Sequence, residues 1–246
     1  MNVIEEYINA SKNMTSSSGG TNKKCYLFDN VVLLEEDTRG AKKIFQAKGK
    51  IDILKSKDVN VCRILETTII NDKLYELQEK ASGKEMFENY GDSSLEGQQE
   101  FLKTLDSLSK KDESFYKKFL SDWANILESG FIIDPSKNGN FFYDGEKITF
   151  IDLDFVEDEK KEKISNAREH MLIHAAIILR GGGLPWYYKN FFAEANEKVK
   201  IIYQKLGKAA IELGENVESY ISYLDSDGNY GLREYFDSFQ GSPLSM

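Results

Sequence analysis

The chain has 246 residues, of which 41% are hydrophobic and 30% charged, so it can bury a substantial core and is not a candidate for intrinsic disorder. Its formal net charge of −9 argues against a broad surface for nucleic acid or anionic membranes, because phosphates repel an acidic protein. Cys25 and Cys62 are too few for a secreted disulfide framework, and no stretch approaches the roughly 18 apolar residues of a membrane span. We expect a cytoplasmic protein, and a bacterial effector injected by a dedicated apparatus would have the same features.

The first 80 residues have the pattern of a small β-rich unit that contains one helix. A Ser/Gly-rich turn at 14–20 precedes two strands, KKCYLF and VVLLEE. Helical spacing of apolar residues follows, and then two segments of alternating and β-branched character. The predicted elements are a hairpin about Asp29–Asn30, a helix over 40–55 and strands over 61–70 and 73–80.

From residue 81 onward the character becomes mainly helical, with one interruption. Amphipathic patterns predict helices, whereas two short apolar runs about Asp144–Gly145 predict a second hairpin. We therefore expect an α+β fold with a β-rich lobe over 1–80 and a helical lobe over 81–246. The predicted helices span 95–108, 114–128, 160–180, 188–213 and 216–224, and the hairpin strands span Asn140–Tyr143 and Ile148–Phe155.

The chemically informative stretch is GFIIDPSKNGNFFYDGEKITFIDLDF, residues 130–155. A short apolar strand delivers Asp134, a polar loop follows, Asn140 opens the hairpin and the returning strand delivers Asp152. A hairpin with Asn at its entry and Asp at its exit brings both side chains to one end. There Asn can lend a neutral oxygen and Asp its anionic oxygens to Mg²⁺. Asp134, one loop earlier, can then orient or deprotonate an attacking hydroxyl.

This stretch resembles the protein-kinase-like superfamily, which includes atypical and minimal bacterial kinases and small-molecule kinases of the aminoglycoside phosphotransferase and choline kinase type. The resemblance covers roughly 14–180 and implies a two-lobed fold that binds ATP and Mg²⁺. It carries Asp134 into the catalytic role, and Asn140 and Asp152 into metal binding. Asn140 follows Asp134 by six positions where the family has five, so Asn138 competes for its role.

The same resemblance implies a nucleotide site in the first lobe. LYELQEKASG is similar to the family's fifth strand and hinge, where backbone groups near Glu79 and Ala81 would hydrogen-bond adenine. The Ser/Gly turn, with Gly19 and Gly20, is similar to the loop that covers the phosphates.

The chain departs from the family at the ion pair that usually holds the phosphates. Leu34 stands where the third-strand lysine is expected, and the helix offers Gln46 or Ala47 in place of its glutamate partner. Lys23 or Lys24 on the neighbouring strand could supply the cation, which resembles the solution of the with-no-lysine kinases. The competing interpretation is that these lysines only keep an edge strand soluble.

Structural interpretations compete with each functional one. Asp134 and Asp152 could be ordinary turn residues, although an acid inside the apolar run ITFIDLDF is costly to bury without a partner. His170 and His174 have the spacing of paired metal ligands, but the neighbouring apolar stripe favours packing. The run from Asp225 imitates a calcium loop and then breaks the pattern, which favours a polar turn before a terminal helix.

Two functions follow from these residues. The first is an ATP-dependent phosphotransferase that moves a γ-phosphate to a hydroxyl of a protein or small molecule. The second is a pseudokinase that acts as a nucleotide-binding or protein-interaction module. The retained Asp134, Asn140 and Asp152 favour the enzyme, and the missing lysine–glutamate pair favours the pseudokinase.

Overall fold

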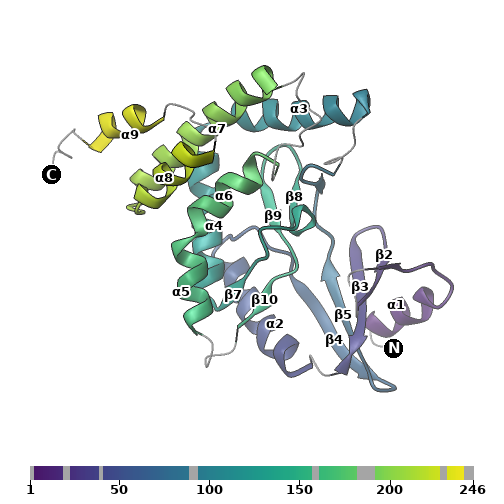
Figure 1. Ribbon diagram of the computed structural model, residues 1–246. Coiled ribbons are helices and arrows are strands. Elements are labelled where there is room, and N and C mark those ends of the chain that lie inside the picture. The colour runs from purple at the N-terminus through teal and green to yellow at the C-terminus, as the bar shows by residue number, and fades with distance from the viewer. Residues whose placement is uncertain are drawn as a thin grey trace.

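A computed structural model describes residues 3–18, 23–38, 41–88, 94–156, 161–181, 192–227 and 232–240. It is an α+β structure in which 54% of residues are helical and 20% lie in strands. Figure 1 shows an antiparallel sheet with a helix beside each face, next to a larger group of helices that surrounds a short hairpin.

The sheet has five antiparallel strands in the order β1-β2-β3-β5-β4. Asn71 and Asp72 join β4 to β5 with φ of 49° and 59°, a left-handed turn that Asn and Asp tolerate better than other side chains do. The predicted order of strand, strand, helix, strand, strand is present, and β1 is an added short edge strand. The bounds are β1 Ser17–Ser18, β2 Lys24–Leu27, β3 Val31–Asp37, β4 Ile64–Ile70 and β5 Lys73–Glu79.

The two faces of the sheet carry different helices. α1, Val3–Ser11, contributes Ile4 and Ile8 to a small core on one face, a segment for which the sequence suggested no element. α2, Ala41–Ser56, lies on the opposite face. Successive strand residues point to opposite sides of the sheet, so alternate residues face α1 and α2. The small core beneath α1 consists of Ile4, Ile8, Tyr26, Leu33, Tyr75 and Leu77.

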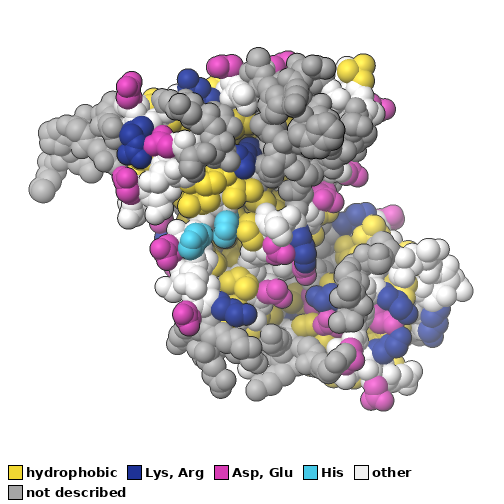
Figure 2. All heavy atoms as spheres, in the orientation of Figure 1, with side chains coloured by type: hydrophobic (Ala, Val, Ile, Leu, Met, Phe, Trp, Pro, Cys, Tyr) yellow, Lys and Arg dark blue, Asp and Glu magenta, His cyan; other side chains and the backbone are white. Residues whose placement is uncertain are grey.

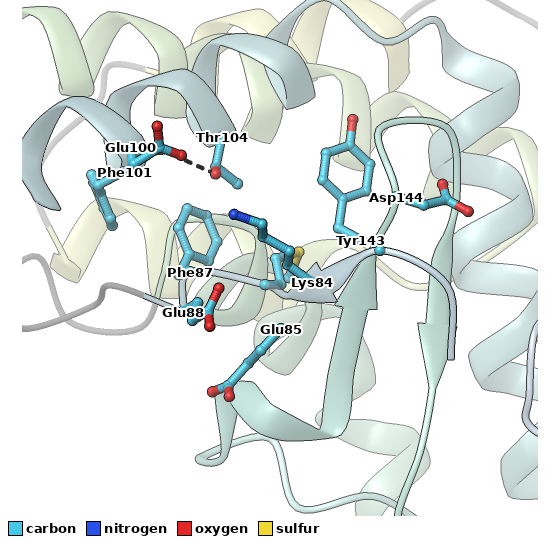
Figure 3. A pocket seen from close by; sticks show the side chains of 11 residues that line it. Lys84, Glu85, Phe87, Glu88, Glu100, Phe101, Thr104, Tyr143 and Asp144 are labelled. Atoms are coloured by element: carbon cyan, nitrogen blue, oxygen red, sulfur yellow. Dashed lines mark hydrogen bonds between the residues drawn. The ribbon is translucent and has the colours of Figure 1, made fainter. Parts of the chain in front are cut away.

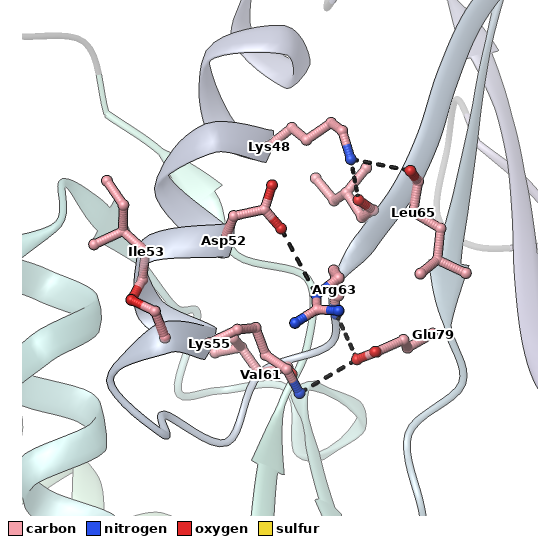
Figure 4. Close-up of polar contacts among 10 residues, drawn as sticks. Lys48, Asp52, Ile53, Lys55, Val61, Arg63, Leu65 and Glu79 are labelled. Atoms are coloured by element: carbon pink, nitrogen blue, oxygen red, sulfur yellow. Dashed lines mark hydrogen bonds and ion pairs between the residues drawn. The ribbon is translucent and has the colours of Figure 1, made fainter.

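Polar contacts hold α2 against the sheet (Figure 4). Lys48 Nζ donates to the backbone oxygen of Leu65 at 3.0 Å, and Lys55 Nζ lies 3.3 Å from the Glu79 carboxylate. Asp52 pairs with Arg63 at 3.7 Å. Lys48, Asp52 and Lys55 therefore tie α2 to β4, β5 and the segment before β4.

The helical part begins with two capped helices, α3 and α4. Ser94 accepts a hydrogen bond from the backbone of Gly97 at 3.0 Å, and Asp112 accepts one from Phe115 at 3.1 Å. The helix predicted over 160–180 is two helices that meet at His170. Residues 188–191, predicted as the start of the next helix, lie outside the described residues. The bounds are α3 Leu95–Ser109, α4 Glu113–Glu128, α5 Lys161–Glu169, α6 Met171–Leu179, α7 Phe192–Glu212, α8 Glu218–Asp227 and α9 Arg233–Gln240.

The hairpin lies against α4 through stacked and edge-on aromatic rings. Phe150 stacks on Phe119 with centroids 5.4 Å apart, and Trp123 meets Phe141 at 5.7 Å. The predicted single strand Ile148–Phe155 is wrong in its middle, where residues 151–153 leave the ladder. The bounds are β6 Lys84–Glu85, β7 Phe131–Ile132, the 3₁₀ turn η2 Asn138–Asn140, β8 Phe141–Tyr143, β9 Ile148–Phe150 and β10 Asp154–Phe155.

The main hydrophobic core joins α2 to the helical part. Ala47, Ile51 and Leu54 of α2 belong to the same buried cluster as Trp123 and Phe150. The predicted boundary between residues 80 and 81 stays a prediction. Among the described residues, every helix is too short or too polar to cross a membrane.

Candidate active site

Asp152 lies at the break between β9 and β10, and its backbone has φ of 52°. A left-handed residue cannot continue a β ladder, which explains why the predicted strand is interrupted here. Asp is one of the few residue types with a side chain that tolerates this conformation. The carboxylate is 55% exposed, so the apolar sequence around it does not bury it. The chain thus presents an accessible charge at a strained position of the kind that clusters at functional sites.

Lys23, just before β2, reaches this carboxylate. Its Nζ lies 3.8 Å from Asp152 Oδ1 and 3.8 Å from Glu36 Oε2. Burial disfavours the charged ammonium, yet Glu36, Asp152 and more distant carboxylates outweigh that effect and leave the pKa of Lys23 above its usual value. Lys23 therefore remains a cation at the end of the sheet that faces Asp152.

Lys24, the other lysine proposed from the sequence, points to the opposite face of the sheet. Its Nζ lies 3.3 Å from Glu35, which also accepts a hydrogen bond from Lys73. Tyr26, in the small core under α1, bonds the same carboxylate at 3.4 Å. The structure thus brings Lys23, and not Lys24, to Asp152.

Two carboxylates that the sequence analysis overlooked share the face of Lys23. Glu36 pairs with Lys23, and Glu76 lies directly across the β3–β5 ladder from Leu34. Glu76 is only 5% exposed, and burial raises the pKa of its carboxyl despite a hydrogen bond from Gln78. The sequence offered one indication of Glu76, since it is an acid between the apolar residues of LYELQ. The same kind of pattern drew attention to Asp152.

A small cavity of about 70 Å³ separates this face from α2. Ile44, Ala47 and Ile51 are the residues with which α2 lines it, while Glu76 and Asp152 line it from the other side. Gln46, the alternative to Ala47, is exposed. The helix thus presents apolar side chains to this cavity.

Asp134 follows β7 and is half exposed. Its Oδ1 accepts hydrogen bonds from the Ser136 hydroxyl at 2.6 Å and the Ser136 backbone at 3.0 Å, and Lys137 Nζ lies 3.7 Å from Oδ2. The Ser136 hydroxyl is the main cause that lowers the pKa of Asp134, with help from its backbone N–H and Lys137. The carboxylate is ionised at neutral pH, as a base must be.

Asn140 ties the predicted site residues together. It is 5% exposed, its Nδ2 donates to the backbone oxygen of Asp134 at 3.1 Å, and its own backbone oxygen accepts from Ile151 at 2.9 Å. One residue therefore fixes both the loop after Asp134 and the segment before Asp152. The side chain of Asn138 lies outside what the structure describes.

The predicted nucleotide-covering residues are only partly described. Gly19 and Gly20 lie outside the described residues. The backbone N–H of Glu79 donates to Arg63 at 2.9 Å, so it already serves the sheet, and Ala81 follows two residues later beyond the end of β5. An adenine contact at this place would fall to the Glu79 carbonyl or to backbone groups beyond it.

The oxygen ligands at this site suit Mg²⁺ and do not form a preassembled metal cage. Within the described ranges, no three His, Cys, Asp or Glu side chains are grouped closely enough to hold a metal ion. Mg²⁺ usually takes one or two protein oxygens and fills its remaining positions with water and phosphate. The accessible carboxylate of Asp152 and the amide oxygen of Asn140 fit that requirement.

No family model and no curated protein matches this chain. The site combines three groups. Lys23 is a cation at the end of the sheet, the accessible carboxylate of Asp152 lies opposite it, and Asp134 adds a second carboxylate one loop away. These are the parts that phosphate positioning and proton abstraction from a hydroxyl require.

A larger cavity of about 240 Å³ lies on the far side of β6 (Figure 3). Lys84 points toward the space between Phe87 and Tyr143, whereas Glu85 points away from it. Glu85 lies against the η2 turn, since a Cβ added at Gly139 would meet its carboxylate at 3.4 Å. β6 thus separates this cavity from the loop that carries Asn140.

The remaining motifs from the sequence are also placed. His170 is exposed and His174 half-buried, so the predicted packing of this pair in the core is wrong for His170. In the calcium-like run, Phe236 is fully buried within α9, and residues 228–231 lie outside the described part.

Proposed function

We propose that this chain is an ATP-dependent phosphotransferase, an atypical kinase that moves the γ-phosphate to a hydroxyl of a protein or small molecule. The observation that carries the proposal is the approach of Lys23 Nζ to Asp152 Oδ1, at 3.8 Å. Lys23, just before β2, supplies the cation that the third strand lacks.

Each residue has a distinct role in the proposal. Lys23 binds phosphate oxygens, and Asp152 with Asn140 holds Mg²⁺, which neutralises charge on the phosphates when bound. Asp134 orients the acceptor hydroxyl and takes its proton. The hydrogen bond from Asn140 to the backbone of Asp134 keeps the base and the metal ligands in register.

The charge balance around Lys23 supports a site for a divalent cation. Four carboxylates, those of Glu36, Glu76, Asp152 and Asp154, act on one ammonium group. Such an excess of negative charge repels a bare triphosphate and attracts Mg²⁺, so nucleotide would bind as its metal complex.

The test is Asp134→Asn, which keeps the shape and removes the charge. We expect phosphate transfer from radioactive ATP, to the protein itself or to a cell lysate, to fall by about 10² to 10⁴. ATP with Mg²⁺ should still stabilise the variant as it does the wild type, because Asp134 contacts the acceptor. Asp144→Asn is the matched control. Asp144 is an acid in the turn between β8 and β9, where it accepts hydrogen bonds from the backbone of Glu146 and Lys147.

A specific observation favours a pseudokinase as the second candidate. The cavity beside Asp152 measures about 70 Å³, whereas small-molecule sites usually exceed about 300 Å³. Equal nucleotide binding by wild type and Asp134→Asn, with no transfer by either, would favour this candidate. Failure of both proteins to bind nucleotide with Mg²⁺ would overturn the kinase and leave only a pseudokinase that acts through protein interaction.

A further inference from the structure

The two histidines lie together on the surface, at the junction of α5 and α6. The chain has only these two, His170 and His174, and their rings stack with centroids 6.0 Å apart and planes 26° apart. The backbone N–H of His174 donates to the carbonyl of His170 at 2.9 Å, so one helical turn separates them. Figure 2 shows the histidine side chains side by side, next to a hydrophobic area.

A backbone carbonyl fixes the tautomer of His170. Its Nδ1 lies 2.8 Å from the backbone oxygen of Asn166. Because a carbonyl can only accept, Nδ1 carries the proton and the lone pair is on Nε2. Metal-bound histidines typically donate their second ring nitrogen to a carbonyl or carboxylate in this way, which orients the ring and makes it more basic.

His174 is half-buried, and its ring stacks on that of His170. Its imidazole forms no hydrogen bond within the part of the chain that the structure describes. A neutral imidazole with an unused lone pair is the form that binds metals.

We propose that His170 and His174 chelate one borderline divalent transition-metal ion, of the class of Zn²⁺, Ni²⁺ and Cu²⁺, through their ring nitrogens. Metal–nitrogen bonds of about 2 Å place two imidazoles on one metal with centroids roughly 5 Å apart, so a small side-chain rotation from 6.0 Å suffices. Water completes the coordination, which makes the ion exchangeable. The nitrogen ligands distinguish this ion from the Mg²⁺ of the proposed kinase site, since Mg²⁺ prefers oxygen ligands.

The experiment uses the full chain without an affinity tag, and NiCl₂ as the probe in the absence of nucleotide. Cys25→Ser removes one competing thiol. The other, Cys62, is a poor competitor because burial raises the pKa of its thiol to about 11. Calorimetry should give one Ni²⁺ per chain. His170→Gln and His174→Gln should each weaken binding at least tenfold. Glu169→Gln, an exposed neighbour with a carboxylate, should leave it unchanged.

A second measurement does not depend on the variants folding. With two histidines in the chain, the proton NMR spectrum should show two imidazole Hε1 signals, one for each ring. Substoichiometric Ni²⁺ should broaden both at the same added concentration. Broadening of neither signal, of only one signal, or undiminished Ni²⁺ binding by His174→Gln would overturn the chelate.

Discussion

Asp122 in α4 and Asp152 between β9 and β10 are acids in apolar stretches of sequence, and the fold uses them in opposite ways. Asp122 is 2% exposed and accepts hydrogen bonds from Lys118 at 2.7 Å and from the backbone and side chain of Asn60 at 3.2 and 2.9 Å. Asp152 is 55% exposed and has Lys23 at 3.8 Å.

The difference separates an acid that holds the fold from one that is available for chemistry. Asp122 joins α4 to the segment at residue 60, which also bonds the backbone of Phe150 at 2.8 Å. Both of its carboxylate oxygens accept hydrogen bonds from the protein. Asp152 keeps its oxygens open toward solvent, although its backbone is constrained. The two roles differ in whether the carboxylate oxygens accept hydrogen bonds from the protein, more than in how apolar the surrounding sequence is.

The largest effect on folding is expected for Asp122→Ala. Removing this carboxylate leaves Asn60 with unsatisfied donors and Lys118 without its nearest acid, which should lower the free energy of unfolding by about 3 kcal/mol. Urea denaturation measures the change. The matched substitution Asp152→Asn should alter it by less than about 0.5 kcal/mol. Equal losses at both positions would contradict the division of roles.

Asp152→Asn tests the functional side of the comparison. Asn tolerates the left-handed backbone, so the fold is kept while the carboxylate proposed to hold Mg²⁺ is lost. Saturation at about 100 times Kd stabilises a protein by about 2.7 kcal/mol, and the variant should lose most of the Mg²⁺-dependent part of that gain from ATP. Thermal shifts with ATP, with and without Mg²⁺, measure it. An unchanged shift would remove Asp152 from the metal site.

Lys23→Met should weaken ATP binding or turnover by more than about 1.4 kcal/mol, or tenfold. Lys24→Met is the control, because Lys24 faces Glu35 on the other side of the sheet, and it should have little effect. Adding Leu34→Lys to Lys23→Met should restore part of the loss, since position 34 lies across from Glu76 on the same face. Indifference to Lys23→Met would show that this lysine does not serve the phosphates.

The smallest effects concern pH, and two neighbouring acids should differ in sign. Burial raises the pKa of Glu76 in the folded state above 4.5, so its charge costs stability at pH 8, and that cost disappears as the pH falls below 4.5. Glu76→Gln should therefore be more stable than the wild type at pH 8, by a margin that shrinks toward pH 4. Denaturation at several pH values measures the margin.

Glu35→Gln is the control for this pH dependence. Burial would raise the pKa of Glu35, but hydrogen bonds from Lys73 and Lys24 outweigh it and lower the pKa. Its charge thus contributes stability above pH 4.5 that is lost as the pH falls through the lowered pKa. Glu35→Gln should be less stable than the wild type at pH 8, and the deficit should diminish in acid. The same sign for both variants would contradict the pairing of Lys24 with Glu35.

Local patterns predicted much of the secondary structure. α2, α3 and α4 lie within one residue of their predicted bounds, because the apolar spacing that predicts a helix is a property of the local sequence. The Asp144–Gly145 turn was likewise predicted from residues that favour it.

Tertiary contacts limited the rest. Lys23 and Lys24 are adjacent in sequence, and only the register of β2 against β3 directs one toward Asp152 and the other toward Glu35. Glu76 was overlooked because its place beside Lys23 depends on the pairing of β5 with β3, which the local sequence does not give. The break at Asp152 was not predicted, because apolar residues continue on both sides of it and the pattern does not show that the backbone there is left-handed.

The left-handed backbone at Asp152 has a consequence for how this chain would vary over generations. Asp, Asn and Gly are the residues that accept such a conformation most readily, and single nucleotide changes interconvert Asp codons with Asn and Gly codons. A substitution of this kind removes the charge while the local shape survives. A single nucleotide change could therefore remove the proposed Mg²⁺ ligand without disturbing the fold, and selection for stability alone would not prevent it.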